Sequence, residues 1–156
     1  MSPTGKTSKS ARKRGRPPVV GQRLFLKIKL WRWDVSWLFG LATPRGLFSN
    51  DGRFYEHTAL RMRGTVQYPE NFKYPEVECD LVADARLRLD KDPPTCIGSM
   101  QANGKTLKIY IPVYDSRLDT LISSGDRLMF MEVSAEPLRY RTARVMSINL
   151  SSVLEE

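Results

Sequence analysis

The chain contains few of the side chains that build metal centres. Its 156 residues include two cysteines, Cys79 and Cys96, and one histidine, His57. Two thiols and one imidazole cannot supply the four ligands of an ordinary structural zinc site, and the cysteines form no CxxC pair. We therefore expect no metal site and no disulfide, with both cysteines acting as small buried hydrophobic residues.

Long apolar segments are also missing. No stretch approaches the roughly 18–20 apolar residues that cross a membrane. No apolar segment follows the first basic residues, as it would in a secretory signal. We expect no membrane partner, and a protein that is cytoplasmic and nucleoid-associated, or nuclear in a eukaryote.

No catalytic motif is present. The sequence has no phosphate-binding loop, dinucleotide fingerprint or nucleophile elbow. The acids between 80 and 92 (Asp80, Asp84, Asp90 and Asp92) alternate with basic residues, which favours surface ion pairing over a metal-dependent nuclease. His57 has no evident catalytic partner. We expect a non-enzymatic protein without a cofactor.

Acidic residues are missing from the first 23 positions, where seven residues are basic. The other 133 positions hold 18 basic and 17 acidic residues, so most of the net charge of +8 belongs to the N-terminal segment. Such asymmetry indicates a tail that meets a polyanion. Residues 1–20 have almost no large apolar side chains, which predicts disorder. The chain length favours one further domain, residues 21–156.

The remaining sequence has the alternation of β-strands. Apolar residues alternate from Leu24 to Leu30 and again from Trp31 to Trp37, but the parity changes between Leu30 and Trp31. A second change lies between Val145 and Met146. One flat strand cannot keep a buried face through such a change, so we expect a β-bulge or a strand that passes between layers.

The other segments complete an all-β prediction. Strands are expected over 54–67, 75–87, 95–101, 105–114, 127–134 and 139–150, with a helix near 116–123 capped by Asp115 or Ser116. Asn103-Gly104 predicts a hairpin with a type I′ turn. About seven strands and one short helix indicate an antiparallel sandwich or a small barrel.

Two of these strands carry opposite charges on their polar faces. Arg61 and Arg63 alternate with apolar residues in 54–67, and Glu78 and Asp80 do so in 75–87. Antiparallel pairing would place the arginines opposite the acids.

The N-terminal segment contains the run Arg12-Lys13-Arg14-Gly15-Arg16-Pro17-Pro18. Its Arg-Gly-Arg-Pro core with basic flanks resembles the AT-hook, a short DNA-binding motif. The resemblance covers residues 12–18 and implies insertion into the minor groove of A/T-rich DNA. Narrow A-tract grooves attract inserted arginine, here Arg14 and Arg16.

The flanking residues have separate roles in this interpretation. Gly15 has no Cβ, so the backbone can approach the groove floor. Pro17 holds the exit extended. Arg12 and Lys13 would contact phosphates, whose counterion release makes binding salt-sensitive. One copy should bind weakly, and oligomerisation would strengthen it. A solvated polycation or a nuclear-import address remains the alternative.

Trp31, Trp33 and Trp37 share one parity with Val35. This pattern favours the core, and base stacking or a protein interface is the alternative. We therefore predict a non-enzymatic DNA-associated protein, with a tail that contacts A/T-rich DNA and a β domain that mediates protein or self association. The alternative is a protein–protein assembly module with an incidental basic tail.

Overall fold

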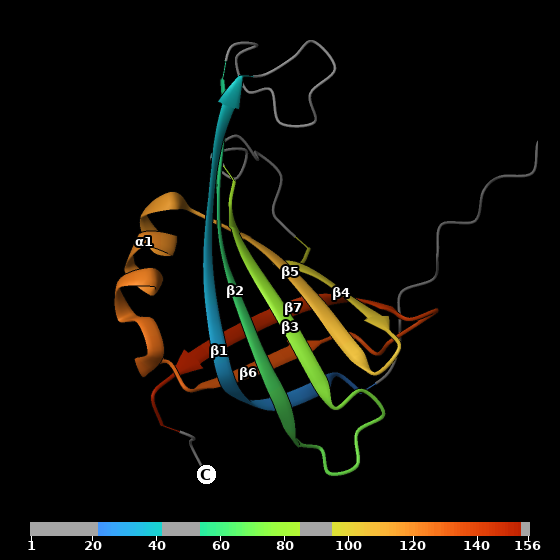
Figure 1. Ribbon diagram of the computed structural model, residues 1–156. Coiled ribbons are helices and arrows are strands. Elements are labelled where there is room, and N and C mark those ends of the chain that lie inside the picture. Colours follow the sequence, from blue (N-terminus) through green and yellow to red (C-terminus); the bar gives the residue numbers. More distant parts are fainter. Residues whose placement is uncertain (1–21, 42–53, 85–94, 154–156) are drawn as a thin grey trace, which may run out of the picture.

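The computed structural model describes residues 22–41, 54–84 and 95–153, which form a closed barrel (Figure 1). The strands are β1 (Leu24–Leu41), β2 (Phe54–Tyr68), β3 (Glu76–Ala83), β4 (Gly98–Asn103), β5 (Thr106–Val113), β6 (Phe130–Ala135) and β7 (Thr142–Ser151). Their order around the barrel is β1-β2-β3-β5-β4-β7-β6. Among these described strands, β3 and β5 are the one pair that is parallel. The all-β prediction is confirmed, with the barrel rather than the sandwich.

Both predicted irregularities are β-bulges. Leu30 pairs with Gly64 and Arg32 with Arg63, so Trp31 is an extra residue in β1. In the β6–β7 pair, Ser134 and Ala135 face Ser147 and Val145, so Met146 is extra. Each bulge restores the inward direction of the apolar residues that follow it.

The barrel interior is filled by alternate residues of every strand. The side chains of Leu26, Ile28, Leu107, Met131 and Val133 are fully buried. The helix α1 (Asp115–Ser124) adds one core side chain, Leu118, which is also buried. Both cysteines are free thiols: Cys79 is buried, as expected, whereas Cys96 is half-buried.

Two local predictions were wrong. The helix α1 begins at Asp115, so its N-cap residue is Tyr114 and not Asp115 or Ser116. Tyr114 makes no side-chain capping hydrogen bond. The β4–β5 loop is Gly104-Lys105, because Asn103 stays in the ladder opposite Thr106. Positive φ occurs at Gly104 (62°) and not at Lys105, which fits a type II′ turn rather than type I′.

The two ends of the molecule differ. β6 pairs with β1 only from Leu24 to Lys29, and β3 pairs with β2 only from Ala59 onward. The rest of β1 and β2 therefore extends past the barrel as a two-stranded ribbon, residues 36–41 and 54–58 (Figure 1). The β2–β3, β4–β5 and β6–β7 connections lie away from this ribbon, at the lower right of the figure.

Candidate nucleic-acid interface and association surface

The AT-hook-like segment lies outside the described residues, which begin at Gln22. The structure therefore does not place Arg12, Lys13, Arg14, Gly15, Arg16 or Pro17. It does place their attachment point, because Leu24 pairs with Ala135, the last residue of β6. The first described residues, Gln22 and Arg23, therefore precede a strand end that lies beside the β6–β7 connection.

The β6–β7 connection ends in a tight turn of unusual composition. Arg139 and Thr142 exchange backbone hydrogen bonds of 2.8 and 2.9 Å, and the two residues between them have positive φ, 49° at Tyr140 and 66° at Arg141. These are the features of a type I′ turn, which favours Asn-Gly. A positive φ costs a residue with a Cβ about 1 kcal/mol or more. Tyr140 is 92% exposed, so core packing does not offset that cost.

Hydrogen bonds hold two other connections next to this turn. The Ala102 amide donates to the Arg141 carbonyl (2.8 Å), which ties the turn to the β4–β5 hairpin. The Glu76 amide donates to the Lys105 carbonyl (3.3 Å), which ties that hairpin to the β2–β3 connection. We call this end of the barrel the basic end. Its exposed cations are Arg23, Lys73, Lys105, Arg139 and Arg141.

The acids of the basic end balance only part of this charge. Glu136 bonds Arg144 through both carboxylate oxygens (2.7 and 3.0 Å), and these hydrogen bonds raise the pKa of Arg144. Glu76 accepts a hydrogen bond from Thr106 (3.4 Å), and Glu70 is exposed. The cations of the basic end outnumber Glu70 and Glu76, so this end is attractive to an anionic polymer.

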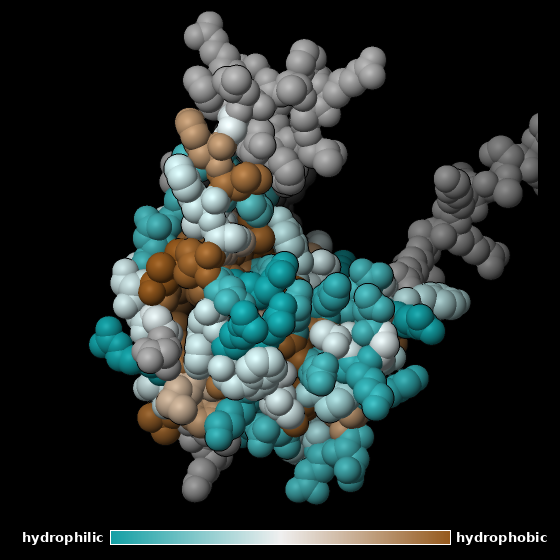
Figure 2. Space-filling view, viewed as in Figure 1, coloured by the Kyte–Doolittle hydropathy of each residue, from teal (hydrophilic) through white to brown (hydrophobic). Residues whose placement is uncertain are grey.

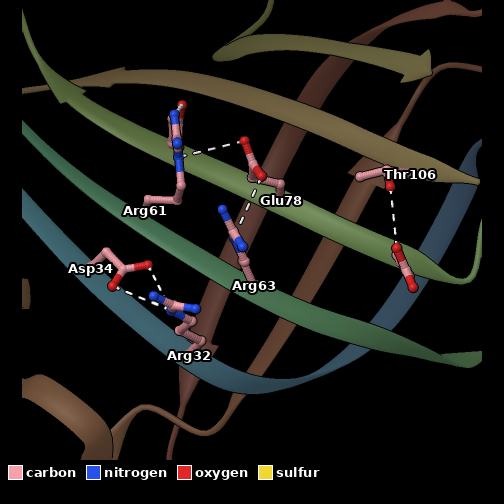
Figure 3. A network of polar contacts seen from close by, with 8 residues as sticks. Arg32, Asp34, Arg61, Arg63, Glu78 and Thr106 are labelled. Atoms are coloured by element: carbon pink, nitrogen blue, oxygen red, sulfur yellow. Dashed lines mark hydrogen bonds and ion pairs between the residues drawn. The ribbon is translucent and has the colours of Figure 1, made fainter. Parts of the chain in front are cut away.

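The outer face of β1, β2 and β3 is charged but balanced (Figure 3). The Arg61 guanidinium binds Asp80 at 2.8 and 3.0 Å, and this pairing raises the pKa of Arg61. Arg63 lies 3.5 Å from Glu78. The predicted charge complementarity of the two strands is confirmed. Because carboxylates occupy these arginines, the face does not suit phosphate binding.

The same outer face has a shallow hollow of about 280 Å³, lined by Asp34, Ser36, Ala59, Arg61 and Asp80. Its one cation is already paired with one of its acids. Within residues 22–41, 54–84 and 95–153, no group of three His, Cys, Asp or Glu side chains could hold a metal ion. His57 is half-buried on the polar face of β2.

The tryptophans occupy three different environments. Trp33 is half-buried and packs against the core, and its Nε1 is buried without a hydrogen-bond partner. Trp31, at the bulge, is 56% exposed, and Trp37, on the ribbon, is 62% exposed. The core interpretation was therefore wrong for Trp31 and Trp37. Trp31 is the extra residue of the bulge, and at Trp37 only β2, among the described strands, pairs with β1.

The ribbon carries a continuous apolar row. Val35, Trp37 and Phe39 alternate along β1 and are all more than half exposed. The Trp37 and Phe39 rings lie parallel, with centroids 5.9 Å apart. The Trp37 Nε1 donates to Glu56 Oε1 at 3.0 Å. Figure 2 shows hydrophobic surface along β1 and the ribbon, whereas the basic end at the lower right is hydrophilic.

The carboxylate of Glu56 makes the ribbon unfavourable for nucleic acid. Single-stranded nucleic acid is held by aromatic rings together with cations that follow its phosphates. At Trp37 the neighbouring charge is negative. The ribbon is therefore better suited to a protein surface, and the basic end to nucleic acid.

Among the described residues, no helix is long and apolar enough to cross a membrane. No family model matches this chain, and neither a curated protein nor a solved structure matches it. The function is therefore inferred from the basic end and the ribbon.

Proposed function

We propose that this protein is a non-enzymatic DNA-associated protein, in which the basic tail and the basic end bind DNA and the ribbon mediates association. The tail would enter the minor groove of A/T-rich DNA through Arg14 and Arg16. The basic end would contact phosphates beside it. In this proposal the protein acts in the nucleoid or nucleus and needs no cofactor.

The β6–β7 turn is the observation that carries the proposal. Strained backbone persists where the surrounding structure imposes it, and it is concentrated at functional sites. Tyr140 and Arg141 occupy two strained positions in succession, with exposed side chains, beside the attachment point of a tail with an AT-hook-like run. A cationic turn at that position would continue the tail's contact with the DNA backbone.

One double variant of the turn tests the proposal, because it should change the free energy of unfolding and the DNA affinity in opposite directions. Tyr140→Asn/Arg141→Gly gives the turn its preferred residues. We expect the free energy of unfolding to rise by about 1 kcal/mol or more, since two strained residues are replaced. We expect DNA affinity to fall several-fold, with the salt slope reduced by about one for the lost phosphate contact. Urea denaturation and fluorescence anisotropy on an A/T-rich duplex measure the two effects.

Two further variants make the result specific. Arg117→Ala removes one charge from exposed α1, away from the β6–β7 turn (Figure 1), and should leave affinity unchanged. Arg14→Ala/Arg16→Ala should abolish the preference for A/T-rich over G/C-rich duplexes. If the full chain binds neither duplex at low salt, or if the turn variant keeps full affinity and salt slope, the proposal is wrong.

The exposed apolar row of the ribbon favours a second candidate, a protein–protein assembly module whose tail is incidental. Monomeric proteins seldom leave a contiguous aromatic and aliphatic row in water unless it has a binding role. Loss of DNA binding in every titration, together with intact self-association, would support this candidate.

A further inference from the structure

On the edge of β1 that faces away from β2, the described partner strand β6 pairs only as far as Lys29. One residue further along, the Leu30 amide donates a hydrogen bond to the Met129 carbonyl (2.8 Å). From Trp31 to Leu38, no backbone group on that side pairs with any residue that the structure describes. An open edge offers a row of donors and acceptors to another strand.

Proteins usually protect such an edge with lysine, proline or a charge that points inward. Between Val35 and Phe39 the sequence is Val-Ser-Trp-Leu-Phe, with none of these. The Trp37 ring nitrogen, the one polar side-chain atom of the apolar row, is already bonded to Glu56. The row can therefore be covered without leaving that nitrogen unpaired.

The apolar row has an apolar residue at the same spacing on each side of Trp37: Val35 two residues before it and Phe39 two residues after it. In an antiparallel pair of two β1 strands centred there, Trp37 faces the Trp37 of a second copy, and Val35 faces its Phe39. On the other face, Ser36 lies opposite the Leu38 of the second copy. Neither side chain is charged, so the pairing brings no like charges together and buries no charge. Such a two-fold arrangement is isologous and closes after two chains, which prevents growth into fibres.

Glu56 does not oppose this arrangement. It lies on β2, so two copies of Glu56 would be separated by three strand spacings, about 14 Å. That is more than the screening length of about 8 Å at physiological ionic strength. Repulsion between these carboxylates is therefore weak.

We propose that two copies of this chain pair antiparallel through the open edge of β1, centred on Trp37, and form one continuous sheet across the dimer. This identifies the partner of the association surface, and it rests on that part of the proposed function. The dimer carries two tails and two basic ends. One bound tail raises the effective concentration of the other, so weak single contacts combine into tighter DNA binding.

The test places charges at the proposed two-fold axis of the full-length chain. Like charges directly opposite across two strands are destabilising, and opposite charges are stabilising. We expect the parent to sediment as a dimer, and Trp37→Lys and Trp37→Glu each to raise the dimer dissociation constant at least tenfold. An equimolar mixture of the two variants should recover the dimer. Sedimentation equilibrium at several concentrations measures all three.

Trp31→Lys is the matched control, since Trp31 is exposed on the same strand but lies outside the paired segment. It should keep the parent's dissociation constant. Thermal unfolding midpoints close to the parent's would show that the Trp37 variants are folded. A parent that is monomeric at every concentration, a Trp37→Lys variant that dimerises like the parent, or a mixture that stays monomeric would each overturn the proposal.

The outcome is independent of the DNA measurement. Arg14→Ala/Arg16→Ala should lose the preference for A/T-rich DNA and still dimerise. Failure of the dimer with intact tail binding refutes only the partner, whereas failure of DNA binding with an intact dimer refutes only the DNA role.

Discussion

The two halves of β1 have the same alternation of apolar residues and opposite surroundings. In the first half, Leu26 and Ile28 are fully buried, because β6 pairs with both residues and β2 pairs with β1 on the other side from Lys27 onward. In the second half, Val35 is 54% and Trp37 62% exposed, because β2 is the one described strand that continues beside β1. Alternation specifies which side chains share a face, and other elements decide whether that face is covered.

The difference has an energetic meaning. Each Å² of apolar surface removed from water contributes about 25 cal/mol. The first half of β1 gains this on folding, whereas the row of Val35, Trp37 and Phe39 can still gain it on association. The predictions below test whether the two halves are energetically as distinct as their surroundings.

The largest effect should come from truncating one side chain in each half. Leu26→Ala leaves a cavity in a closely packed interior and should lower the free energy of unfolding by about 2–5 kcal/mol. Phe39→Ala changes an exposed ring and should lower it by less than about 1 kcal/mol. Urea denaturation in dilute solution, where dimerisation contributes least, measures both. Equal losses would show that the ribbon is as tightly covered as the barrel.

The junction of the two halves should be sensitive to added volume. A Cβ on Gly64 would lie 2.6 Å from the Lys29 carbonyl oxygen and 2.7 Å from Ile28 Cγ2. Gly64→Ala should therefore cost about 1–3 kcal/mol through overpacking. Thr65→Ala, at the next and exposed position, should cost less than about 1 kcal/mol. If Gly64→Ala is as stable as the parent, β1 and β2 do not approach each other this closely at the bulge.

Much of the fold follows from local sequence patterns. The parity changes at Leu30–Trp31 and Val145–Met146 predicted both bulges, and the charges of Arg61 and Asp80 predicted a strand pair. These signals act between neighbours in the chain or across one ladder. The parallel β3–β5 pair and barrel closure are long-range pairings, and no local pattern encodes them.

The candidate surfaces were harder to predict for the same reason. Lys73, Lys105 and Arg141 are far apart in the sequence, and backbone hydrogen bonds bring their segments together. The Tyr140-Arg141 turn carries none of the usual turn residues, so sequence patterns missed it. Its signal was indirect: the run Arg139-Tyr140-Arg141 interrupts the apolar alternation where a hairpin has to turn. The exposure of Trp37 depended on where β3 and β6 end.

The smallest expected effect comes from a comparison of two thiols. One is the buried thiol of Cys79, and the other is a thiol introduced at Val35, on the exposed apolar row of the ribbon. Burial, with a further contribution from the charge of Asp80, raises the pKa of the Cys79 thiol. The unfolded thiol ionises above its ordinary pKa of about 8.5, while the folded thiol stays protonated. Stability is therefore complete below that pH and falls as the pH rises, by about 1 kcal/mol at pH 9.5 relative to pH 7. Cys79→Ala should remove this part of the dependence, which urea denaturation at both pH values detects.

Iodoacetamide should modify an introduced Val35→Cys at the rate of an exposed thiol and leave Cys79 unmodified. Equal rates at the two positions would mean that the covered and uncovered parts of the sheet are equally open to solvent.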